Sequence, residues 1–339
     1  MNQPQRVTPA SRGLADPDDE RSNCGVGMVM DLDGGSDHSV VADGLELLEN
    51  LEHRGTTGAE PNTGDGAGIL LQTPHEFLAD ELPVELPGTY AVGSFFFPQA
   101  ADEREPMQAL VETTLGDRGV DVLHWRDVPT DNEGLGQTAL DSEPDVWQAV
   151  VAPADSGTDT ETFDRSLYEA RRVVEKTVDE VEFEGAERFY VCSLDRKTLV
   201  YKGLLTGEQL PSYYPDLRDE RVDSTFVLVH ERFSTNTLGA WHLAHPYRGI
   251  VHNGEFNTIQ GNINWMRARQ TDLESDELDL DAIRPIIQDP DQSDTASVDN
   301  ALELLTQERD LPHALRMLVP EAWRGDDSMD PARKDFYDY

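Results

Sequence analysis

Cys24-Gly25-Val26-Gly27-Met28 follows a polar leader of 23 residues and begins the part of the chain with clear strand and helix patterns. A cysteine becomes a strong nucleophile when cleavage makes it the first residue, because its own α-amino group then lies within reach of its thiol. Free α-amino groups have a pKa of about 7.7–8.0, so a useful fraction accepts the thiol proton at neutral pH. A lone cysteine is more often a small buried hydrophobe, and the case for Cys24 therefore depends on its companions.

The charge of the chain limits its partners. Its 339 residues include 27 basic and 67 acidic side chains, which gives a net charge of −40. Such a charge argues against nucleic acid and against an anionic membrane surface as partners. Molar salt, where the Debye length is about 3 Å, would remove the self-repulsion of this surface. We therefore hypothesise an acidic, halophilic protein in a salt-rich cytoplasm.

The number of cysteines and the hydropathy of the chain exclude further classes of protein. Cys24 and Cys192 are the two cysteines of the sequence, without a C-x-x-C motif, which argues against a disulfide scaffold and against a zinc or iron–sulfur site in this chain. Apolar runs stay below the roughly 18 residues of a membrane helix, and the leader lacks the apolar core of a secretion signal. We expect a cytoplasmic location by default.

The apolar pattern predicts a mixture of strands and helices. Strands are expected at 24–30, from Ile69 to Leu71, and at 90–97, 147–151, 226–230 and 249–252. Helices are expected at 39–51, 163–181, 258–269, 296–308 and 311–318. Residues 189–194 and 198–205 are predicted to pair as a hairpin, and 100–185 to form an inserted layer of helices with peripheral strands. This mixture suits a sheet sandwich with outer helices better than a regular βαβ wind.

Five motifs follow one another in a characteristic order. They are Cys24-Gly25-Val26-Gly27, Glu52-His53-Arg54-Gly55, the glycine-rich string 58–68, Arg232-Phe233-Ser234-Thr235-Asn236-Thr237 and His252-Asn253-Gly254-Glu255-Phe256-Asn257-Thr258. In this order the motifs resemble the glutaminase domain of glutamate synthase, a class II glutamine amidotransferase within the N-terminal-nucleophile hydrolases. Other class II members share the cysteine, the His-Arg-Gly and the Asn-Gly. The string 58–68 and residues 257–269 resemble glutamate synthase specifically.

The resemblance implies a fold and a division of the chain. It implies an α+β fold, the four-layer αββα sandwich of the N-terminal-nucleophile hydrolases, lacking its final C-terminal strands. Residues 1–23 would be a propeptide that is removed, and residues 24–339 one glutaminase domain that is shorter at its C-terminal end than in the family.

The resemblance also implies an activity. The enzyme would hydrolyse glutamine and release ammonia for glutamate synthesis from 2-oxoglutarate. No cofactor or metal is expected in this chain, whereas FMN and an iron–sulfur cluster are expected in a synthase domain or a partner subunit. Glutamine and that synthase portion are the expected partners, and an oligomeric assembly is compatible with this interpretation.

Four residues receive catalytic roles from the resemblance. Cys24 attacks the side-chain amide carbon of glutamine, and its own amine carries the proton to the departing ammonia. The side-chain amide of Asn253 and the backbone N–H of Gly254 bind the oxyanion of the tetrahedral intermediate. Arg54 orders the loop near the nucleophile.

Three further residues would recognise the free amino acid. Arg232 suits the α-carboxylate because a guanidinium forms a bidentate pair with it, and Thr235 adds a hydroxyl donor. Asp294 occupies the position that binds the α-ammonium in the family.

Each assignment has a plainer alternative from local sequence. Asn253-Gly254 is also a common hairpin turn, and Arg232 could serve a structural ion pair. Asp294 could cap the helix at 296–308, and Arg54 could be a charge at a helix C-terminus. For the chain as a whole, the alternatives are a non-catalytic or immature fragment that binds glutamine or a synthase partner, and a class II amidotransferase with another acceptor.

Overall fold

The computed structural model describes residues 25–55, 57, 60–232, 239–252, 258–287 and 293–338. Four of the predicted site residues, Cys24, Thr235, Asn253 and Gly254, lie outside these ranges. Arg54, Arg232 and Asp294 lie within them. None of the helices in the described ranges is long and apolar enough to cross a bilayer.

The described ranges contain both strands and helices, and the last strand precedes a run of helices. The strands are β1 (Val26–Met30), β2 (Ala67–Gln72), β3 (Ala91–Phe97), β4 (Val120–Asp127), β5 (Asp145–Pro153), β6 (Tyr190–Asp195), β7 (Thr198–Gly203) and β8 (Phe226–Glu231). The α-helices are α1 (His38–Asn50), α2 (His75–Glu81), α3 (Ala101–Gly116), α4 (Gln137–Asp141), α5 (Thr160–Val181), α6 (Leu210–Tyr213), α7 (Gln260–Arg269), α8 (Leu280–Ile283), α9 (Asp294–Thr306), α10 (Leu311–Leu318) and α11 (Pro331–Asp338). Short 3₁₀ turns are η1 (Glu52–Arg54), η2 (Ala186–Arg188), η3 (Pro215–Arg218), η4 (Trp241–Leu243) and η5 (Gln270–Asp272).

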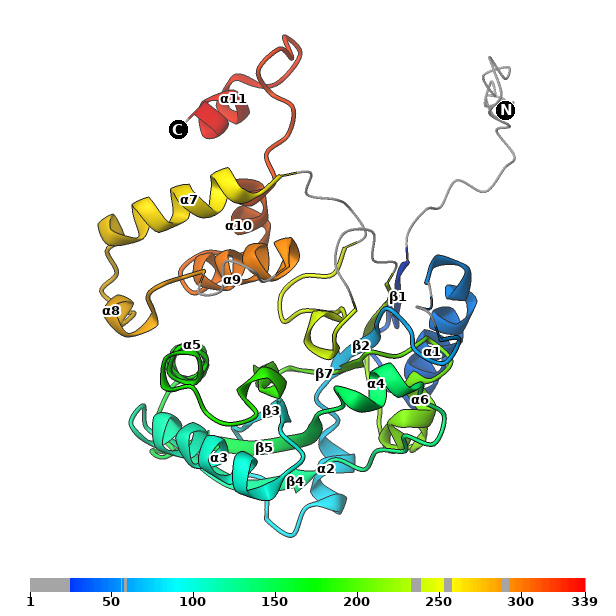
Figure 1. Ribbon diagram of the computed structural model, residues 1–339. Helices are drawn as coiled ribbons and strands as arrows, with labels where there is room; N and C mark the ends of the chain where they lie inside the picture. The colour runs from blue at the N-terminus through cyan, green and yellow to red at the C-terminus, as the bar shows by residue number, and fades with distance from the viewer. Residues whose placement is uncertain are drawn as a thin grey trace, which may run out of the picture.

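Two antiparallel sheets form the centre of the molecule. The first has the strand order β1-β8-β2-β7 and the second the order β4-β5-β3-β6. Helix α1 packs on the first sheet, and α3 and α5 pack on the second, so the layers run helix, sheet, sheet, helix (Figure 1). The predicted α+β sandwich of αββα type is therefore confirmed.

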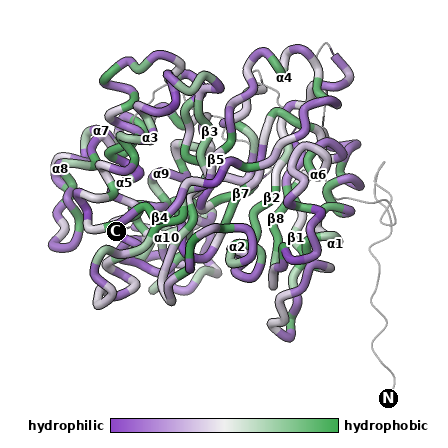
Figure 2. Tube along the Cα trace, turned by 90° about the horizontal axis from the view of Figure 1, so that it is seen from below, coloured by the Kyte–Doolittle hydropathy of each residue, from purple (hydrophilic) through white to green (hydrophobic). Residues whose placement is uncertain are grey.

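Alternation of side chains along the strands explains the layers. In β3, Phe96 faces the core between the sheets, where it joins Leu70 and Val200, whereas Phe95 and Phe97 face the helices of the outer layer. Successive side chains of a strand point to opposite faces, so one strand supplies two cores. Along the Cα trace, hydrophobic residues gather in strands such as β2 and β7, and hydrophilic residues are frequent in the outer segments (Figure 2).

The predicted hairpin of 189–194 and 198–205 is wrong in its pairing. Both strands exist, but β6 pairs with β3 in the second sheet and β7 pairs with β2 in the first. The Asp195 carboxylate accepts hydrogen bonds from the backbone N–H groups of Lys197 and Thr198, which fixes the turn between them. The chain thus crosses from one sheet to the other, because each strand has an apolar face that the sandwich core covers.

Two further expectations are corrected. The segment 100–185 is not an inserted peripheral layer, because β5 is paired on both sides, with β3 and with β4. Residues 249–252 do not form a strand. The backbone N–H of Gly249 donates instead to the Asp299 carboxylate on α9, 2.8 Å away. A side chain on a neighbouring helix therefore replaces the strand partner that the apolar pattern suggested.

Candidate functional site

Gly25, the residue after Cys24 in the sequence, packs closely against the end of β8 and against Arg54. Its carbonyl accepts a hydrogen bond from the Glu231 N–H at the end of β8, with an N–O distance of 2.7 Å. A Cβ at Gly25 would overlap the Glu231 carbonyl and lie 3.5 Å from Arg54 Cβ. Glycine permits such close backbone approach. The structure thus brings Arg54 and the end of β8 to the start of the expected catalytic domain.

Arg54 reaches this place through the end of α1. The helix ends at Asn50, and η1 continues the chain through Arg54, whose N–H donates to the Leu51 carbonyl. The expected position beside the nucleophile segment is therefore compatible with the plainer interpretation of Arg54 as a charge just after a helix C-terminus.

Glu231 is a buried carboxyl at the same end of the site. Its side chain approaches Gly55 and Gly207 so closely that a Cβ at either position would overlap a carboxylate oxygen or crowd it. Burial raises the pKa of Glu231 to about 8, with smaller contributions from nearby Glu52 and Glu208 and against the effect of the Gly207 backbone N–H. The carboxyl is therefore largely protonated at neutral pH.

Arg232 directly follows β8 and lies beside the start of β2. Its N–H donates to the Gly66 carbonyl at 2.9 Å, at the start of β2. Burial lowers the pKa of the Arg232 guanidinium, against the opposing effects of Tyr247 and Asp65. A desolvated guanidinium favours a carboxylate partner, because the charge pair is stronger where water is excluded.

Lys202 is a fully buried lysine on β7 beside this region. Its Nζ donates to the His242 carbonyl at 2.9 Å and lies 4.6 Å from the centroids of the Tyr190 and Tyr247 rings. Burial lowers the pKa of Lys202 to about 8. Lys202 therefore holds η4 against the sandwich through a hydrogen bond and two cation–π contacts.

Asp294 is the first residue of α9 and not its cap. The cap is Ser293, whose hydroxyl accepts a hydrogen bond from the Ala296 N–H at 3.1 Å. Tyr247 fixes this cap, because its hydroxyl lies 2.7 Å from the Ser293 hydroxyl. The simple alternative for Asp294 as an N-cap is therefore wrong, and its carboxylate lies in the first turn of α9.

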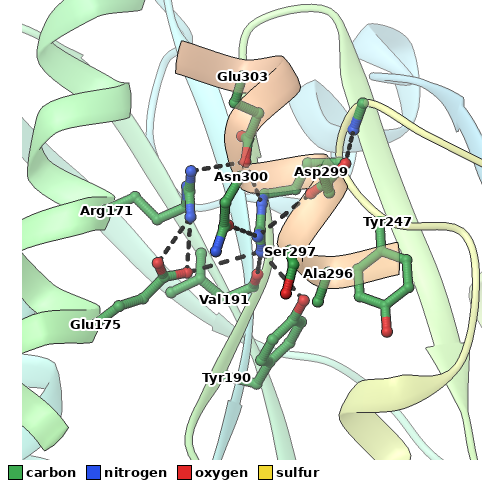
Figure 3. Close-up of polar contacts among 12 residues, drawn as sticks. Arg171, Glu175, Tyr190, Val191, Tyr247, Ala296, Ser297, Asp299, Asn300 and Glu303 are labelled. Carbon is green, nitrogen blue, oxygen red and sulfur yellow. Dashed lines mark hydrogen bonds and ion pairs between the residues drawn. The ribbon is translucent and has the colours of Figure 1, made fainter. Parts of the chain in front are cut away.

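Arg248 joins α9 to the sandwich in a buried ion network. Its guanidinium contacts Glu303 at 2.9 Å and Asp299 at 3.3 Å on α9, and donates to the Val191 carbonyl of β6 at 2.8 Å. Arg171 on α5 pairs with Glu303 from the other side at 2.7 Å. Figure 3 shows the labelled side chains of α5 and α9 converging on this centre.

The sequence motifs did not predict that several of these residues would lie at the site. Glu231 left one signal, an acidic residue at the end of an apolar strand, and Lys202 left another, a lone lysine in an apolar run. The pairing of Arg248 with Asp299 left no signal, because the two residues are distant in sequence and meet only through the packing of α9. No cluster of three or more potential metal ligands occurs within the described ranges.

Sequence comparison places these elements in a known family. The profile of the family "Glutamine amidotransferases class-II" matches residues 24–339. The chain belongs to the class-II glutamine amidotransferases. This class-II amidotransferase domain thus begins, in the match, at the cysteine that the motif order singled out.

Relatives of this class-II amidotransferase domain carry glutamate synthase names. The chain is 42% identical over 98% of its length to the "Glutamate synthase [NADPH] large chain" of Bacillus subtilis, of which it covers 22%. It is 41% identical over 98% of its length to the "Glutamate synthase [NADH]" of Saccharomyces cerevisiae, of which it covers 16%. The "Ferredoxin-dependent glutamate synthase 2" of Synechocystis is 39% identical over 95% of the chain, which covers 21% of it. The resemblance to glutamate synthase is confirmed, and the chain spans about a fifth of these relatives.

Proposed function

We propose that this domain hydrolyses glutamine with Cys24 as its N-terminal nucleophile and supplies ammonia for glutamate synthesis, as the glutaminase part of a glutamate synthase. The observation that carries the proposal is the family match that starts at Cys24 and covers both predicted ends of the site. The packing of Gly25 against Arg54 and β8 supports it, because this packing holds the start of the matched domain beside Arg54.

The chemistry needs one residue to act as both nucleophile and base. Removal of residues 1–23 would expose the α-amine of Cys24, which takes the thiol proton as the sulfur attacks the amide carbon of glutamine. The same proton passes to the departing ammonia, and water then hydrolyses the γ-glutamyl thioester. Asn253 and Gly254 would donate hydrogen bonds to the oxyanion in both steps.

Recognition of the amino-acid end falls to residues of opposite charge. Arg232 would bind the α-carboxylate with help from the Thr235 hydroxyl, and Asp294 would bind the α-ammonium. Desolvation of Arg232 supports its role, because burial lowers the pKa of its guanidinium and a desolvated guanidinium attracts a carboxylate more strongly than a hydrated one. The position of Asp294 in the first turn of α9, next to the Ser293 cap, leaves its carboxylate without a capping task.

The remaining functions of a glutamate synthase would belong to other parts. FMN and an iron–sulfur cluster would lie in a synthase domain or partner subunit, because clusters take cysteine ligands and Cys192 is buried in β6 of this domain. No step of glutamine hydrolysis passes through either group. The net charge of −40 supports a location in a salt-rich cytoplasm.

Paired substitutions test the proposal. We expect Cys24→Ala to abolish ammonia release, Asn253→Ala to lower kcat by about 10²–10³-fold, and Arg232→Ala chiefly to raise KM for glutamine. Steady-state assays of glutaminase activity distinguish these effects. Retained turnover in Cys24→Ala would refute the nucleophile, and a reversed pattern for Asn253 and Arg232 would exchange their roles. Glutamine binding without ammonia release by the native chain would favour a non-catalytic fragment.

A further inference from the structure

His252 connects strand β8, which directly precedes Arg232, to helix α9, which begins at Asp294. Its backbone carbonyl lies 3.1 Å from Nε2 of His230, which is two residues before Arg232 on β8. Its ring Nε2 lies 2.8 Å from Oγ1 of Thr295, which directly follows Asp294 on α9. A chain of two hydrogen bonds therefore joins the end of β8 to the first turn of α9.

The β8 end of this chain has a fixed proton. A carbonyl oxygen accepts only, so His230 donates from Nε2 and carries its ring proton there. Burial lowers the pKa of His230 to about 3, which keeps the ring neutral at physiological pH. The ring of His245 stacks on it, with centroids 4.3 Å apart and an interplanar angle of 20°. His230 is thus held in one orientation and one tautomer.

The α9 end is equally enclosed. Thr295 is 7% exposed, and the helix turn that carries it is fixed by the bond between the Tyr247 and Ser293 hydroxyls. Further along α9, Asp299 accepts a hydrogen bond from the Gly249 N–H. The stretch from Tyr247 to His252 therefore contacts α9 and its cap repeatedly, and its last contact is with Thr295, the residue that directly follows Asp294.

We infer that the chain His230–His252–Thr295 is a positioning device that sets the separation between Arg232 and Asp294, and with it the recognition of the two charges of a free α-amino acid. The inference rests on the proposed function and extends it to residues that touch no substrate. An α-amino acid presents its carboxylate and ammonium at a fixed spacing, so a small shift of α9 relative to β8 weakens one of the two contacts.

Thr295→Val tests the device with little change of shape. Valine keeps the volume of threonine but removes the hydroxyl, so only the link from His252 to α9 is lost. His230 still holds the His252 carbonyl. We expect KM for glutamine to rise about five- to tenfold, the size of one lost hydrogen bond, while kcat stays within about twofold.

Two matched variants serve as controls. Thr295→Ser restores a hydroxyl at the same place and should recover most of the wild-type KM. Thr306→Val removes a hydroxyl from the last residue of the same helix, where Oγ1 donates to the Glu303 carbonyl within the helix, and should leave both constants unchanged. A fall in kcat with unchanged KM in Thr295→Val, or equal effects of the Thr295 and Thr306 substitutions, would overturn the inference.

A measurement without glutamine separates this inference from the proposed function. Hydrogen exchange followed by mass spectrometry reports on the peptides that cover 226–232 and 293–299. We expect faster exchange at 293–299 in Thr295→Val than in wild type and in Thr306→Val. If the native chain neither binds nor hydrolyses glutamine, the proposed function fails, and the exchange result still decides the positioning role. Unchanged exchange at 293–299 would contradict it.

Discussion

The two ends of the candidate site are built by different means. At the nucleophile end, Gly25, Gly55 and Gly207 let backbone and the Glu231 carboxyl approach where any Cβ would collide or crowd. At the amino-acid end, Arg248 and Asp299 hold α9 through buried charges and hydrogen bonds. The first end depends on the absence of side chains, and the second on their polar contacts.

This difference indicates how each end responds to change. Close backbone packing has no alternative arrangement, so added atoms at the nucleophile end should lower the catalytic rate. Polar links transmit small shifts of α9, so lost contacts at the amino-acid end should raise the glutamine requirement. Substitutions at the two ends test this difference, and the one with the largest expected effect is at Arg248.

Arg248→Leu should cause the largest change. It leaves the carboxylates of Asp299 and Glu303 without their shared cation in a buried setting, and removal of one partner from a buried pair costs about 3–5 kcal/mol. Chemical denaturation measures the loss of unfolding free energy, and glutaminase assays should show a raised KM in the folded fraction. Arg188→Leu, which breaks a pair with the exposed Glu187, should change stability far less. Equal losses in the two variants would contradict the role of the network.

Glu231→Gln should stabilise the protein in a pH-dependent way. The pKa of Glu231 is raised from 4.5 to about 8 by burial, so the folded state keeps a proton that the unfolded state releases. The carboxyl therefore contributes fully below pH 4.5, and its contribution is lost as the pH rises towards 8. The variant lacks this loss and should exceed wild-type stability by at most about 4 kcal/mol at pH 8.

Denaturation curves at pH 5 and pH 8 measure this difference. We expect the two proteins to differ little at pH 5 and clearly at pH 8. Glu76→Gln, on the exposed first turn of α2, should follow the wild-type profile. A variant less stable than wild type at pH 8 would mean that Glu231 is ionised and paired in the folded protein.

Gly25→Ala should have the smallest effect on stability but a clear effect on rate. The added methyl group would overlap the Glu231 carbonyl, and such overpacking typically costs about 1–3 kcal/mol. Because Gly25 directly follows Cys24, the added methyl group should displace the nucleophile. We therefore expect kcat to fall more than tenfold with KM nearly unchanged. Gly88→Ala, where an added Cβ meets no atom within 4 Å, is the matched control. A raised KM with an unchanged kcat in Gly25→Ala would contradict the proposed difference between the nucleophile end and the amino-acid end.

Much of the fold was predictable because its signals are local. The apolar runs of β3 and β8 and the apolar pattern of α1 lie within single segments, and these elements occur close to where they were expected. The pairing of strands was harder to predict from the sequence. The crossing between β6 and β7 looked like a hairpin, because a short polar turn between two apolar strands serves either connection.

The candidate site shows the same division. The resemblance to the family predicted site roles for Arg54, Arg232 and Asp294, and all three lie within the described residues. The links from His252 to Thr295 and from Arg248 to Asp299 were not predictable, because each joins residues more than 40 positions apart. The packing of α9 determines these pairs, and a pattern of neighbouring residues in the sequence carries no information about that packing.

Reaction with a glutamine-like diazo-ketone, followed by peptide mass analysis of the chain from its native cell, tests whether Cys24 is the N-terminal nucleophile. We expect one label, on a peptide that begins at Cys24. Cys192 should stay unmodified, because it is buried and burial raises the pKa of its thiol to about 12. Labelling of both cysteines to an equal extent, or label on Cys24 with the leader still attached, would contradict an N-terminal cysteine that acts as its own base.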